Sequence, residues 1–166
     1  PNLLGELAKN VTTVIVTGTN GKTTATSLTD YLLKAAGEAS VAVGNIGEPP
    51  VNEIDGRAHN EWFVAELSSY QIATTAELHP RVAVLLNITH DHLGWHKSHK
   101  NYALAKIKLF ENMVDDDLVV IDVEDAGIHE FDESSTHRVA VSARSLLTSP
   151  RVQTPPLCAT ARWSFA

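Results

Sequence analysis

The segment from Thr17 to Thr24, with the sequence TGTNGKTT, carries the residue types that bind phosphate groups. Glycines let the backbone turn tightly and bring its N–H groups close to a phosphate, and the N-terminus of a following helix adds the positive end of its dipole. Lys22 can reach the β- and γ-phosphate oxygens of a nucleotide, and Thr23 can place its hydroxyl on Mg²⁺. The predicted nucleotide-binding residues are Gly18, Thr19, Asn20, Gly21, Lys22, Thr23 and Thr24.

This loop is a shortened form of the G-x-x-x-x-G-K-[ST] phosphate loop, because Gly18 and Gly21 enclose only Thr19 and Asn20. The alternative interpretation is a glycine-rich turn between a strand and a helix, with Lys22 in solvent. A Gly-Lys-Thr-Thr run at the start of a helical pattern favours phosphate binding over that alternative.

Polar residues follow each of three further apolar runs, 62–65, 82–86 and 118–121. These polar residues are, in the same order, Glu66, the segment Asn87 to His92, and Asp122 with Asp125. Ligands of open α/β sheets bind beyond the carboxyl ends of the strands, so these residues are candidate ligands. Mg²⁺ held beside the phosphates would neutralise Glu66, which closes an apolar run. Position alone supports equally a carboxylate that is stabilised by backbone N–H groups at a helix N-terminus.

The stretch 90–99 contains four histidines, which could suggest a zinc site. The presence of one cysteine, Cys158, and of the helix-breaking Gly94 argues against zinc. We therefore expect most of these histidines at the surface, with His92, nearest the strand end, as the best candidate ligand. The acidic run 115–117 precedes an apolar run, so it lies at the opposite edge of the sheet, where we expect a solvated turn.

Lys106 borders the apolar stripe of its predicted helix, because Tyr102, Lys106 and Phe110 are spaced four residues apart. One interpretation is a snorkelling side chain with a buried stem and an ammonium group in solvent. The other is a lysine directed into the site, where burial and nearby cations would lower its pKa. The residue pattern alone favours the first.

The elements that must position these residues alternate between strands and helices. Apolar or β-branched runs predict strands over 13–16, 40–43, 62–65, 82–86 and 118–121. Helical spacing predicts helices over 23–36, 70–78 and 98–114. The apolar stripes of the first and last helices are Ala25, Leu28 and Leu32, and Ala103, Ile107, Phe110 and Val114.

This alternation predicts an α/β fold with a mostly parallel sheet and flanking helices, like that of P-loop NTPases. The signal is weaker over residues 126–166. There, Val139 to Val141 and Arg162 to Phe165 are candidates for a small additional β-sheet near the C-terminus.

Composition bounds the class of protein. The chain has 166 residues, 43% of them hydrophobic, which is enough for one domain with its own core. One cysteine allows no disulfide within the chain, in keeping with a reducing cytoplasm. No apolar run is long enough to span a membrane, and a net charge of −7 offers no basic surplus for nucleic acid. The start has neither a methionine nor a signal-peptide pattern, so we expect a piece of a longer protein.

Taken together, these residues resemble the central, ATP-binding domain of the Mur ligases, which form amide bonds in peptidoglycan precursors. The stretches that carry the resemblance are 17–24, 44–47, 66–71, 87–92 and 102–112, in the family's order and with similar spacing. The resemblance covers about residues 12 to 122. Within the family, the Glu-Leu-Ser-Ser-Tyr-Gln stretch is most similar to members that add D-glutamate to UDP-N-acetylmuramoyl-L-alanine.

The resemblance implies an ATP-dependent reaction in two steps. The carboxylate of UDP-N-acetylmuramoyl-L-alanine attacks the γ-phosphate of ATP, which gives an acyl phosphate and ADP. The amine of D-glutamate then attacks the acyl carbon, and phosphate leaves. Such phosphoryl transfer needs positioning and charge neutralisation more than covalent help. We expect a monomeric, cytoplasmic enzyme of cell-wall biogenesis, which supports cell shape and cell division.

The resemblance also implies roles for particular residues. Lys22 and the loop N–H groups would bind the β- and γ-phosphates, and Thr23 and Glu66 would hold one Mg²⁺. His92 and Lys106 would serve a second Mg²⁺, with Lys106 carbamylated, since a carbamate is a carboxylate-like anion that suits a metal bound by oxygen ligands. The implied catalytic residues are Lys22, Glu66, His92 and Lys106. The implied substrate contacts are Asn45, Ser68, Ser69 and Gln71.

The chain also departs from the family pattern. Asp122 stands where an asparagine is expected, and the His-Asn stretch that closes the family's central domain is absent. We expect residues 1–166 to be an incomplete central domain without the N-terminal UDP-binding and C-terminal domains. The isolated chain should then bind nucleotide weakly and not turn over.

Three alternatives stay open. A related ligase such as folylpolyglutamate synthetase would share the loop and the Glu66 and His92 ligands, but the stretch 68–71 argues against it. The Mur-like subunit of the lipid II amidating complex would need a cysteine-bound zinc insert, which one cysteine cannot supply. A non-catalytic nucleotide-binding module needs no special chemistry at Lys106, so an added mass of about 44 Da there, from CO₂, would argue against it.

Overall fold

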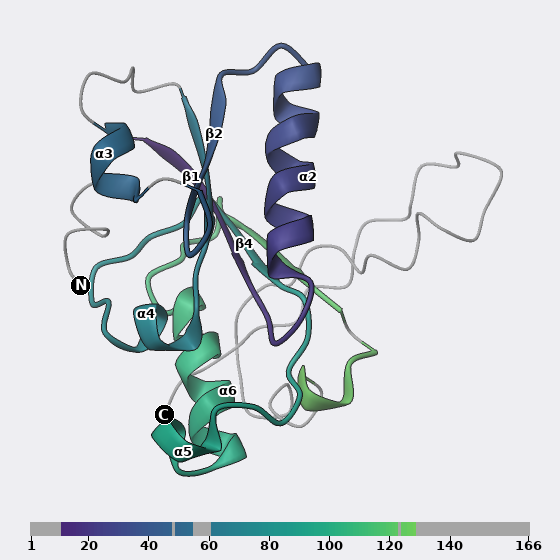
Figure 1. Ribbon diagram of the computed structural model, residues 1–166, viewed down its shortest axis with the longest axis vertical. Helices are drawn as coiled ribbons and strands as arrows, with labels where there is room; N and C mark the ends of the chain where they lie inside the picture. Colours follow the sequence, from purple (N-terminus) through teal and green to yellow (C-terminus); the bar gives the residue numbers. More distant parts are fainter. Residues whose placement is uncertain (1–10, 48, 55–60, 123, 129–166) are drawn as a thin grey trace, which may run out of the picture.

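Five parallel strands form one sheet in the computed structural model, which describes residues 11–47, 49–54, 61–122 and 124–128 (Figure 1). The strands are β1 (Thr12–Thr17), β2 (Ser40–Gly44), β3 (Trp62–Glu66), β4 (Val82–Leu85) and β5 (Leu118–Ile121). Their order across the sheet is β2-β3-β1-β4-β5, so β1 lies in the middle with β3 and β4 beside it. The predicted parallel α/β fold is confirmed, and each predicted strand agrees with an observed one to within one residue at either end.

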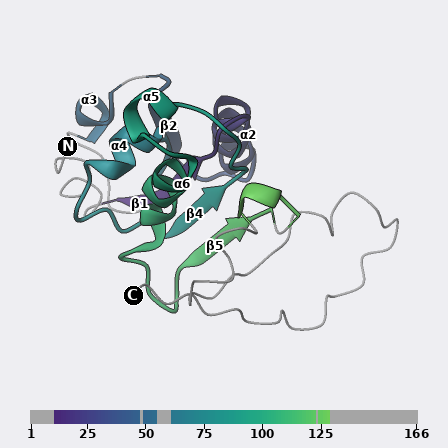
Figure 2. The ribbon, with the colours of Figure 1, turned by 90° about the horizontal axis from the view of Figure 1, so that it is seen from below.

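Helices cover both faces of this sheet (Figure 2). The longest, α2 (Lys22–Ala35), lies over β1, β2 and β3 on one face. On the other face lie α4 (Ser69–Ala73), α6 (His99–Ile107) and the 3₁₀ turn η1 (Lys108–Phe110). Two short helices, α3 (Pro50–Ile54) and α5 (Leu93–His96), follow β2 and precede α6 respectively.

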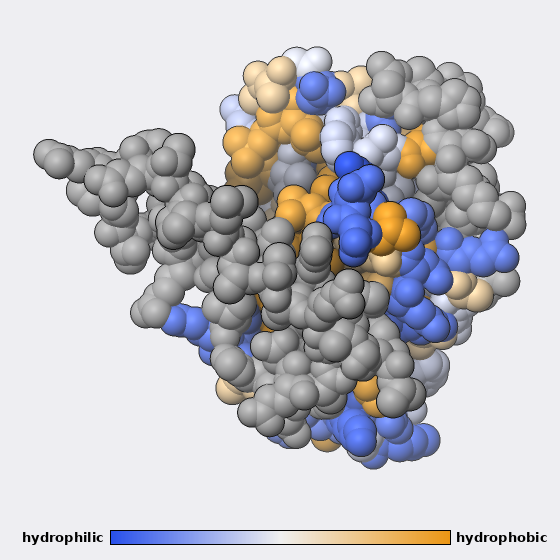
Figure 3. Space-filling model, turned by 180° about the vertical axis from the view of Figure 1, so that it is seen from behind, coloured by the Kyte–Doolittle hydropathy of each residue, from blue (hydrophilic) through white to orange (hydrophobic). Residues whose placement is uncertain are grey.

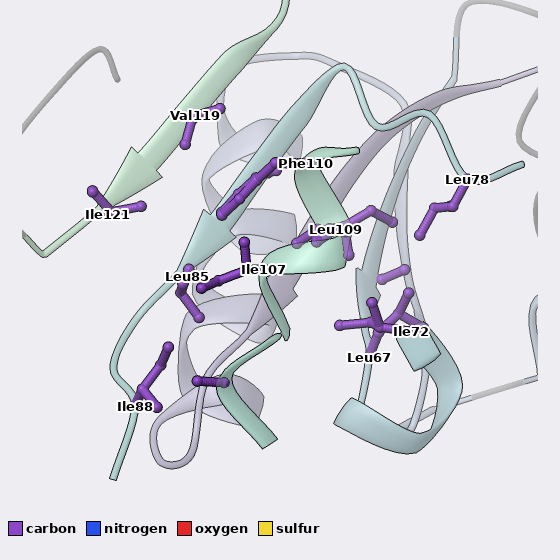
Figure 4. Close-up of a cluster of buried hydrophobic side chains, with 14 of the residues drawn as sticks. Leu67, Ile72, Leu78, Leu85, Ile88, Ile107, Leu109, Phe110, Val119 and Ile121 are labelled. Atoms are coloured by element: carbon purple, nitrogen blue, oxygen red, sulfur yellow. The ribbon is translucent and has the colours of Figure 1, made fainter. Parts of the chain in front are cut away.

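The core is divided by the sheet into two parts, because successive residues of a strand point to opposite faces. On β1, Ile15 packs in the larger cluster, together with the apolar residues of α4, α6 and η1 (Figure 4). Its neighbours Val14 and Val16 pack in a smaller cluster beneath α2. Burial of the middle strand on both faces explains why its sequence is a continuous apolar run rather than an alternating one.

The predicted helices exist, but two of them end earlier than predicted. The α-helical part of the last ends at Ile107 and continues as a 3₁₀ turn to Phe110, so Val114 leaves the stripe and is 59% exposed. Helix α4 ends at Ala73, where the N–H of Thr75 donates to the carbonyl of Ile72, and the carbonyl of Gln71 accepts from the Thr75 hydroxyl instead.

The predicted apolar face of α2 is right for Ala25, which packs against the smaller cluster, but wrong for Leu28 and Leu32, which are 53% and 56% exposed. Thr26 is fully buried. The residues that are at least partly buried include Ala25, Thr26, Thr29 and Leu33.

The predicted sheet of Val139–Val141 and Arg162–Phe165 falls outside the residues that the structure describes. Seen from behind, the coloured surface mixes hydrophobic and hydrophilic residues (Figure 3). Within the described ranges, no helix combines the length and the apolar character needed to cross a membrane.

Candidate functional site

The loop between β1 and α2 lies at the centre of the carboxyl edge of the sheet, since β1 is the middle strand. Gly21 precedes the first helical residue with φ of 82°, a left-handed conformation that favours glycine. Lys22 curls back and its Nζ donates to the carbonyl of Thr19 at 2.9 Å. The first-turn N–H groups of α2, which have no partner within a helix, therefore point out of this loop beside a cation.

Asn87 holds the loop from the neighbouring strand. Its Oδ1 accepts from the backbone N–H groups of Thr19 at 3.0 Å and of Asn20 at 2.9 Å, and its Nδ2 donates to the carbonyl of Asn20 at 3.1 Å. Two of the loop N–H groups are thus already bonded within the protein. A phosphate would meet the first-turn N–H groups of Lys22 to Thr24 more readily.

Glu66 lies beside the loop at the end of β3 and is only 2% exposed. Its Oε2 accepts from the hydroxyl of Thr23 at 2.9 Å, and its Oε1 accepts from Nδ2 of Asn45 at 3.1 Å. Both donors are neutral, so the described residues leave the charge of this carboxylate unbalanced. Because an uncompensated buried charge is costly, this position suits a bound cation.

Asn45 reaches Glu66 only because β2 ends in a glycine. Gly44 has φ of 105°, and a Cβ at this position would collide with the carbonyl oxygen of Glu66. The backbone N–H of Asn45 donates to that carbonyl at 2.9 Å. The alternative in which Glu66 is stabilised by helix N–H groups is not what the structure shows, since its carboxylate meets two side chains.

Lys106 is directed into the site. It is 1% exposed, and its Nζ donates to the carbonyl of Gly18 at 2.8 Å and to Oγ1 of Thr17 at 3.4 Å. The snorkelling interpretation is therefore wrong, because the face of α6 that carries Lys106 packs onto the end of β1. Burial, with the nearby charge of Lys22, lowers the pKa of Lys106 to about 7, although Asp91 opposes the shift.

His92 begins the short helix α5 with a backbone φ of 51°, an uncommon conformation for a residue with a side chain. Its side chain is 44% exposed, and its Nε2 lies 3.4 Å from a carboxylate oxygen of Asp91. The centroid of its ring lies 6.0 Å from that of Tyr102. Lys106 Nζ lies 4.8 Å from the same Tyr102 ring, so both predicted ligands of a second metal border one aromatic side chain.

The expectation that the histidines lie at the surface is wrong for His96, which is buried. Its Nε2 shares a hydrogen bond of 2.9 Å with the hydroxyl of Ser69, and burial lowers its pKa, helped by the charges of His92 and Lys106. His90 and His99 stack with ring centroids 4.2 Å apart. Ring contacts of this kind involve most of the histidines in this segment.

The predicted substrate residues of the stretch 68–71 have partners within the protein. Ser68 and Gln71 form a capping box at the start of α4: the N–H of Ser68 donates to Oε1 of Gln71 at 2.9 Å, and the N–H of Gln71 donates back to Oγ of Ser68 at 3.3 Å. Ser69 is buried against His96. Contact of these residues with a substrate stays a prediction, as it does for Asn45.

The oxygen ligands of Thr23 and Glu66 fit Mg²⁺, which takes few protein ligands and completes its shell with water and phosphate. In the described part of the chain, no three His, Cys, Asp or Glu side chains converge as a metal site. A second cation at His92 and Lys106 therefore fits only if the lysine supplies an anionic oxygen.

Two acidic segments have local roles. The prediction of a solvated turn is wrong for Asp117, whose side chain is 3% exposed. It accepts from His79 at 2.6 Å, from Arg81 at 3.1 Å and from the N–H of Val114 at 2.8 Å. At the carboxyl edge, Asp125 accepts from the N–H of Ile88 at 3.1 Å and so joins the segment after β4 to the segment after β5.

Sequence reasoning placed Asn87 among the candidate ligands, because it follows a strand, but it did not predict that Asn87 holds the phosphate loop. It missed the contact of Tyr102 with that loop. The hydroxyl of Tyr102 lies 3.0 Å from Oγ1 of Thr19, and helical spacing gives no signal for such a hydrogen bond.

The sequence matches that of the Mur ligase middle domain over residues 16–147. Similar proteins include the UDP-N-acetylmuramoylalanine–D-glutamate ligase of Alkaliphilus metalliredigens, which is 38% identical over 135 residues, covering 81% of this chain and 30% of that protein. The ligase of the same name from Geobacter metallireducens is 43% identical over 123 residues, covering 72% and 27%. The chain thus spans less than a third of the length of these relatives.

Solved structures with the same fold include two proteins described as MurF. The protein from Thermotoga maritima, solved in complex with ADP, has a TM-score of 0.63 and 26% identity, covering 77% of this chain and 32% of that one. The protein from Acinetobacter baumannii has a TM-score of 0.63 and 21% identity, covering 80% and 32%.

Proposed function

Because this chain belongs to the Mur ligase family, we propose that it is the middle domain of an ATP-dependent ligase that adds D-glutamate to UDP-N-acetylmuramoyl-L-alanine. The relatives that carry the name of this reaction, at 38% and 43% identity, support the choice of substrates. Such an enzyme would act in the cytoplasm on precursors of the cell wall.

The observation that carries the proposal is the contact between the loop and Glu66. Thr23, in the first turn of α2, and Glu66, at the end of β3, meet at 2.9 Å beside Lys22. In the proposed reaction Lys22 and the first-turn N–H groups bind the β- and γ-phosphates. Thr23 and Glu66 hold one Mg²⁺, which neutralises the charge that develops on the phosphates when it is bound. These residues act by position and charge rather than by covalent chemistry.

Lys106 has the properties needed for carbamylation. At pH near its pKa of about 7, a large share of the side chain is the neutral amine, and only that form attacks CO₂. An N–C bond forms, a proton leaves for solvent, and an anionic carbamate results. Together with His92, which borders the same Tyr102 ring, this carbamate would hold the second Mg²⁺.

The test of the function is ADP release by the whole protein, measured with and without D-glutamate and UDP-N-acetylmuramoyl-L-alanine. We expect release that requires both substrates, and a loss on the order of a hundredfold or more in Lys22→Ala, since a charged donor to the transferred phosphate is removed. Lys34→Ala, which removes an exposed lysine at the far end of the same helix, is the control. Full activity in Lys22→Ala would contradict the proposal.

The isolated 166-residue chain gives a second test. We expect it to bind an ATP analogue weakly and to release no ADP in response to D-glutamate, because it spans less than a third of its relatives. Intact mass of protein kept in bicarbonate should show about 44 Da added at Lys106, which Lys106→Met abolishes. Nucleotide binding without that adduct would favour the non-catalytic module instead.

A further inference from the structure

Tyr102 is a buried residue that lies between the phosphate loop and the two residues proposed to hold the second cation, Lys106 and His92. It lies on α6 and is 1% exposed. Its hydroxyl is 3.0 Å from Oγ1 of Thr19 in the phosphate loop. Its ring lies 4.8 Å from Nζ of Lys106 and, centroid to centroid, 6.0 Å from His92. One side chain therefore contacts the loop and both residues proposed for the second cation.

Thr19 is the point through which this contact acts on the loop. Its Oγ1 also accepts from the N–H of Thr89 at 2.9 Å, and its own N–H donates to Oδ1 of Asn87 at 3.0 Å. Its carbonyl accepts from Nζ of Lys22 at 2.9 Å. Any shift of Thr19 would therefore move the amine that is proposed to meet the phosphates.

The hydroxyl of Tyr102 is suited to a permanent hydrogen bond. The phenol oxygen and Oγ1 of Thr19 lie 3.0 Å apart, and either can donate to the other. The ring alone would serve packing, and a phenylalanine would pack equally well. The position of the hydroxyl, buried and on a loop residue, is what packing does not explain.

We propose that Tyr102 is a positioning residue of the ligase site, which fixes the phosphate loop through Thr19 with its hydroxyl and fixes Lys106 and His92 with its ring. This inference rests on the proposed function for its kinetic test, but its binding test requires only that the loop binds nucleotide. Tyr102 touches neither substrate nor phosphate in this role. It couples two groups that must hold their positions together for the transfer to proceed.

The experiment compares Tyr102→Phe with Tyr31→Phe in the whole protein, since Tyr31 is a 68% exposed tyrosine on α2. We expect Tyr102→Phe to raise KM for ATP about three- to tenfold, the effect of one lost hydrogen bond, with a smaller change in kcat. The mass adduct at Lys106 should persist, because the ring remains. In Tyr102→Leu, which removes the ring, kcat and the adduct should both fall. Tyr31→Phe should match the unchanged protein.

Thr19 supplies an independent second test that does not depend on the folding of Tyr102 variants. Thr19→Ser keeps the hydroxyl and should bind the ATP analogue more tightly than Thr19→Val. Thr19→Val should lower the affinity at least as much as Tyr102→Phe, because it also removes the acceptor of the Thr89 N–H. The double variant Thr19→Val with Tyr102→Phe should bind the analogue no more weakly than Thr19→Val, because the bond between the two side chains is already absent in the single variant. Equal nucleotide affinity in Tyr102→Phe, Thr19→Val and Tyr31→Phe would overturn the inference. If these variants lose affinity for the ATP analogue as expected, but the whole protein releases no ADP with its proposed substrates, the proposed function is overturned and the inference about Tyr102 stands.

Discussion

The two edges of the sheet differ in whether their buried charged side chains have a partner of opposite charge. At the amino edge, the carboxylate of Asp117 has a cationic partner in Arg81, a histidine and a backbone N–H. At the carboxyl edge, Glu66 meets two neutral donors, and Lys106 donates to a carbonyl and a hydroxyl. A charge that is balanced within the protein stabilises the fold, whereas a charge left unbalanced is available to a ligand.

The largest effect should come from Glu66→Gln, which keeps the shape of the side chain and removes its charge. We expect activity of the whole protein to fall about a hundredfold or more, since an amide binds Mg²⁺ far less well than a carboxylate. The melting temperature should stay the same or rise, because an uncompensated buried charge is gone. A large drop in melting temperature would show that Glu66 serves the fold and would remove the contrast between the edges.

The pH dependence of stability in Lys106→Met tests whether the buried charge of Lys106 lacks a partner. Burial sets the folded pKa of Lys106 near 7, below its value of about 10.4 in the unfolded chain. Below pH 7 both states carry the charge and the full cost of burying it is present. Between pH 7 and 10 the unfolded chain binds more protons, so stability rises with pH and the cost is relieved.

Lys106→Met should therefore be more stable than the unchanged protein at pH 6, by a margin that narrows toward pH 10. Urea unfolding of both proteins in CO₂-free buffer at pH 6, 8 and 9.5 measures this margin. A margin that stays constant with pH would contradict the lowered pKa.

Asp117→Asn tests the other edge. We expect a loss of about 1 to 2 kcal/mol in the free energy of unfolding at pH 7, with no change in nucleotide binding, because the hydrogen bonds to His79 and Arg81 lose their charge. Its three donors hold the pKa of Asp117 below its usual value, outweighing the opposite effect of burial. The stabilisation is thus present above about pH 4 and is lost as pH falls through the lowered pKa. Equal stability of the two proteins at pH 7 would argue against this account.

The smallest effect belongs to the pair Lys34 and Asp30 on α2, whose charged atoms lie 2.8 Å apart and whose lysine side chain is 54% exposed. Lys34→Ala should cost about 0.3 to 0.5 kcal/mol at low salt and nothing measurable at high salt, because solvent screens such a pair. Urea unfolding at two salt concentrations checks this. If Lys34→Ala lowers the free energy of unfolding as much as Asp117→Asn does, solvent exposure does not explain the difference expected between the two ion pairs.

The sequence predicted best what periodicity and strand topology determine. The strands follow from their apolar runs, and parallel strands with helical crossovers place Glu66 and Asn87 at the same edge as the loop. Periodicity failed for Leu28 and Leu32, which are exposed while the polar Thr26 between Ala25 and Ser27 is fully buried. Periodicity also failed for Lys106. Helical spacing shows that this lysine borders the apolar stripe of α6, but it does not show whether the ammonium group lies in solvent or is buried against the end of β1. Contacts such as Tyr102 with Thr19 join residues 83 positions apart and depend on packing that no local pattern encodes.

No amino acid other than glycine fits at position 44. Every other amino acid carries a Cβ, which would strike the carbonyl of Glu66 and push Asn45 off the carboxylate. Gly94, in contrast, would bring an added Cβ within 4 Å of none of the described atoms. Among descendants of this sequence, substitutions should accumulate freely at residue 94 and be purged at residue 44.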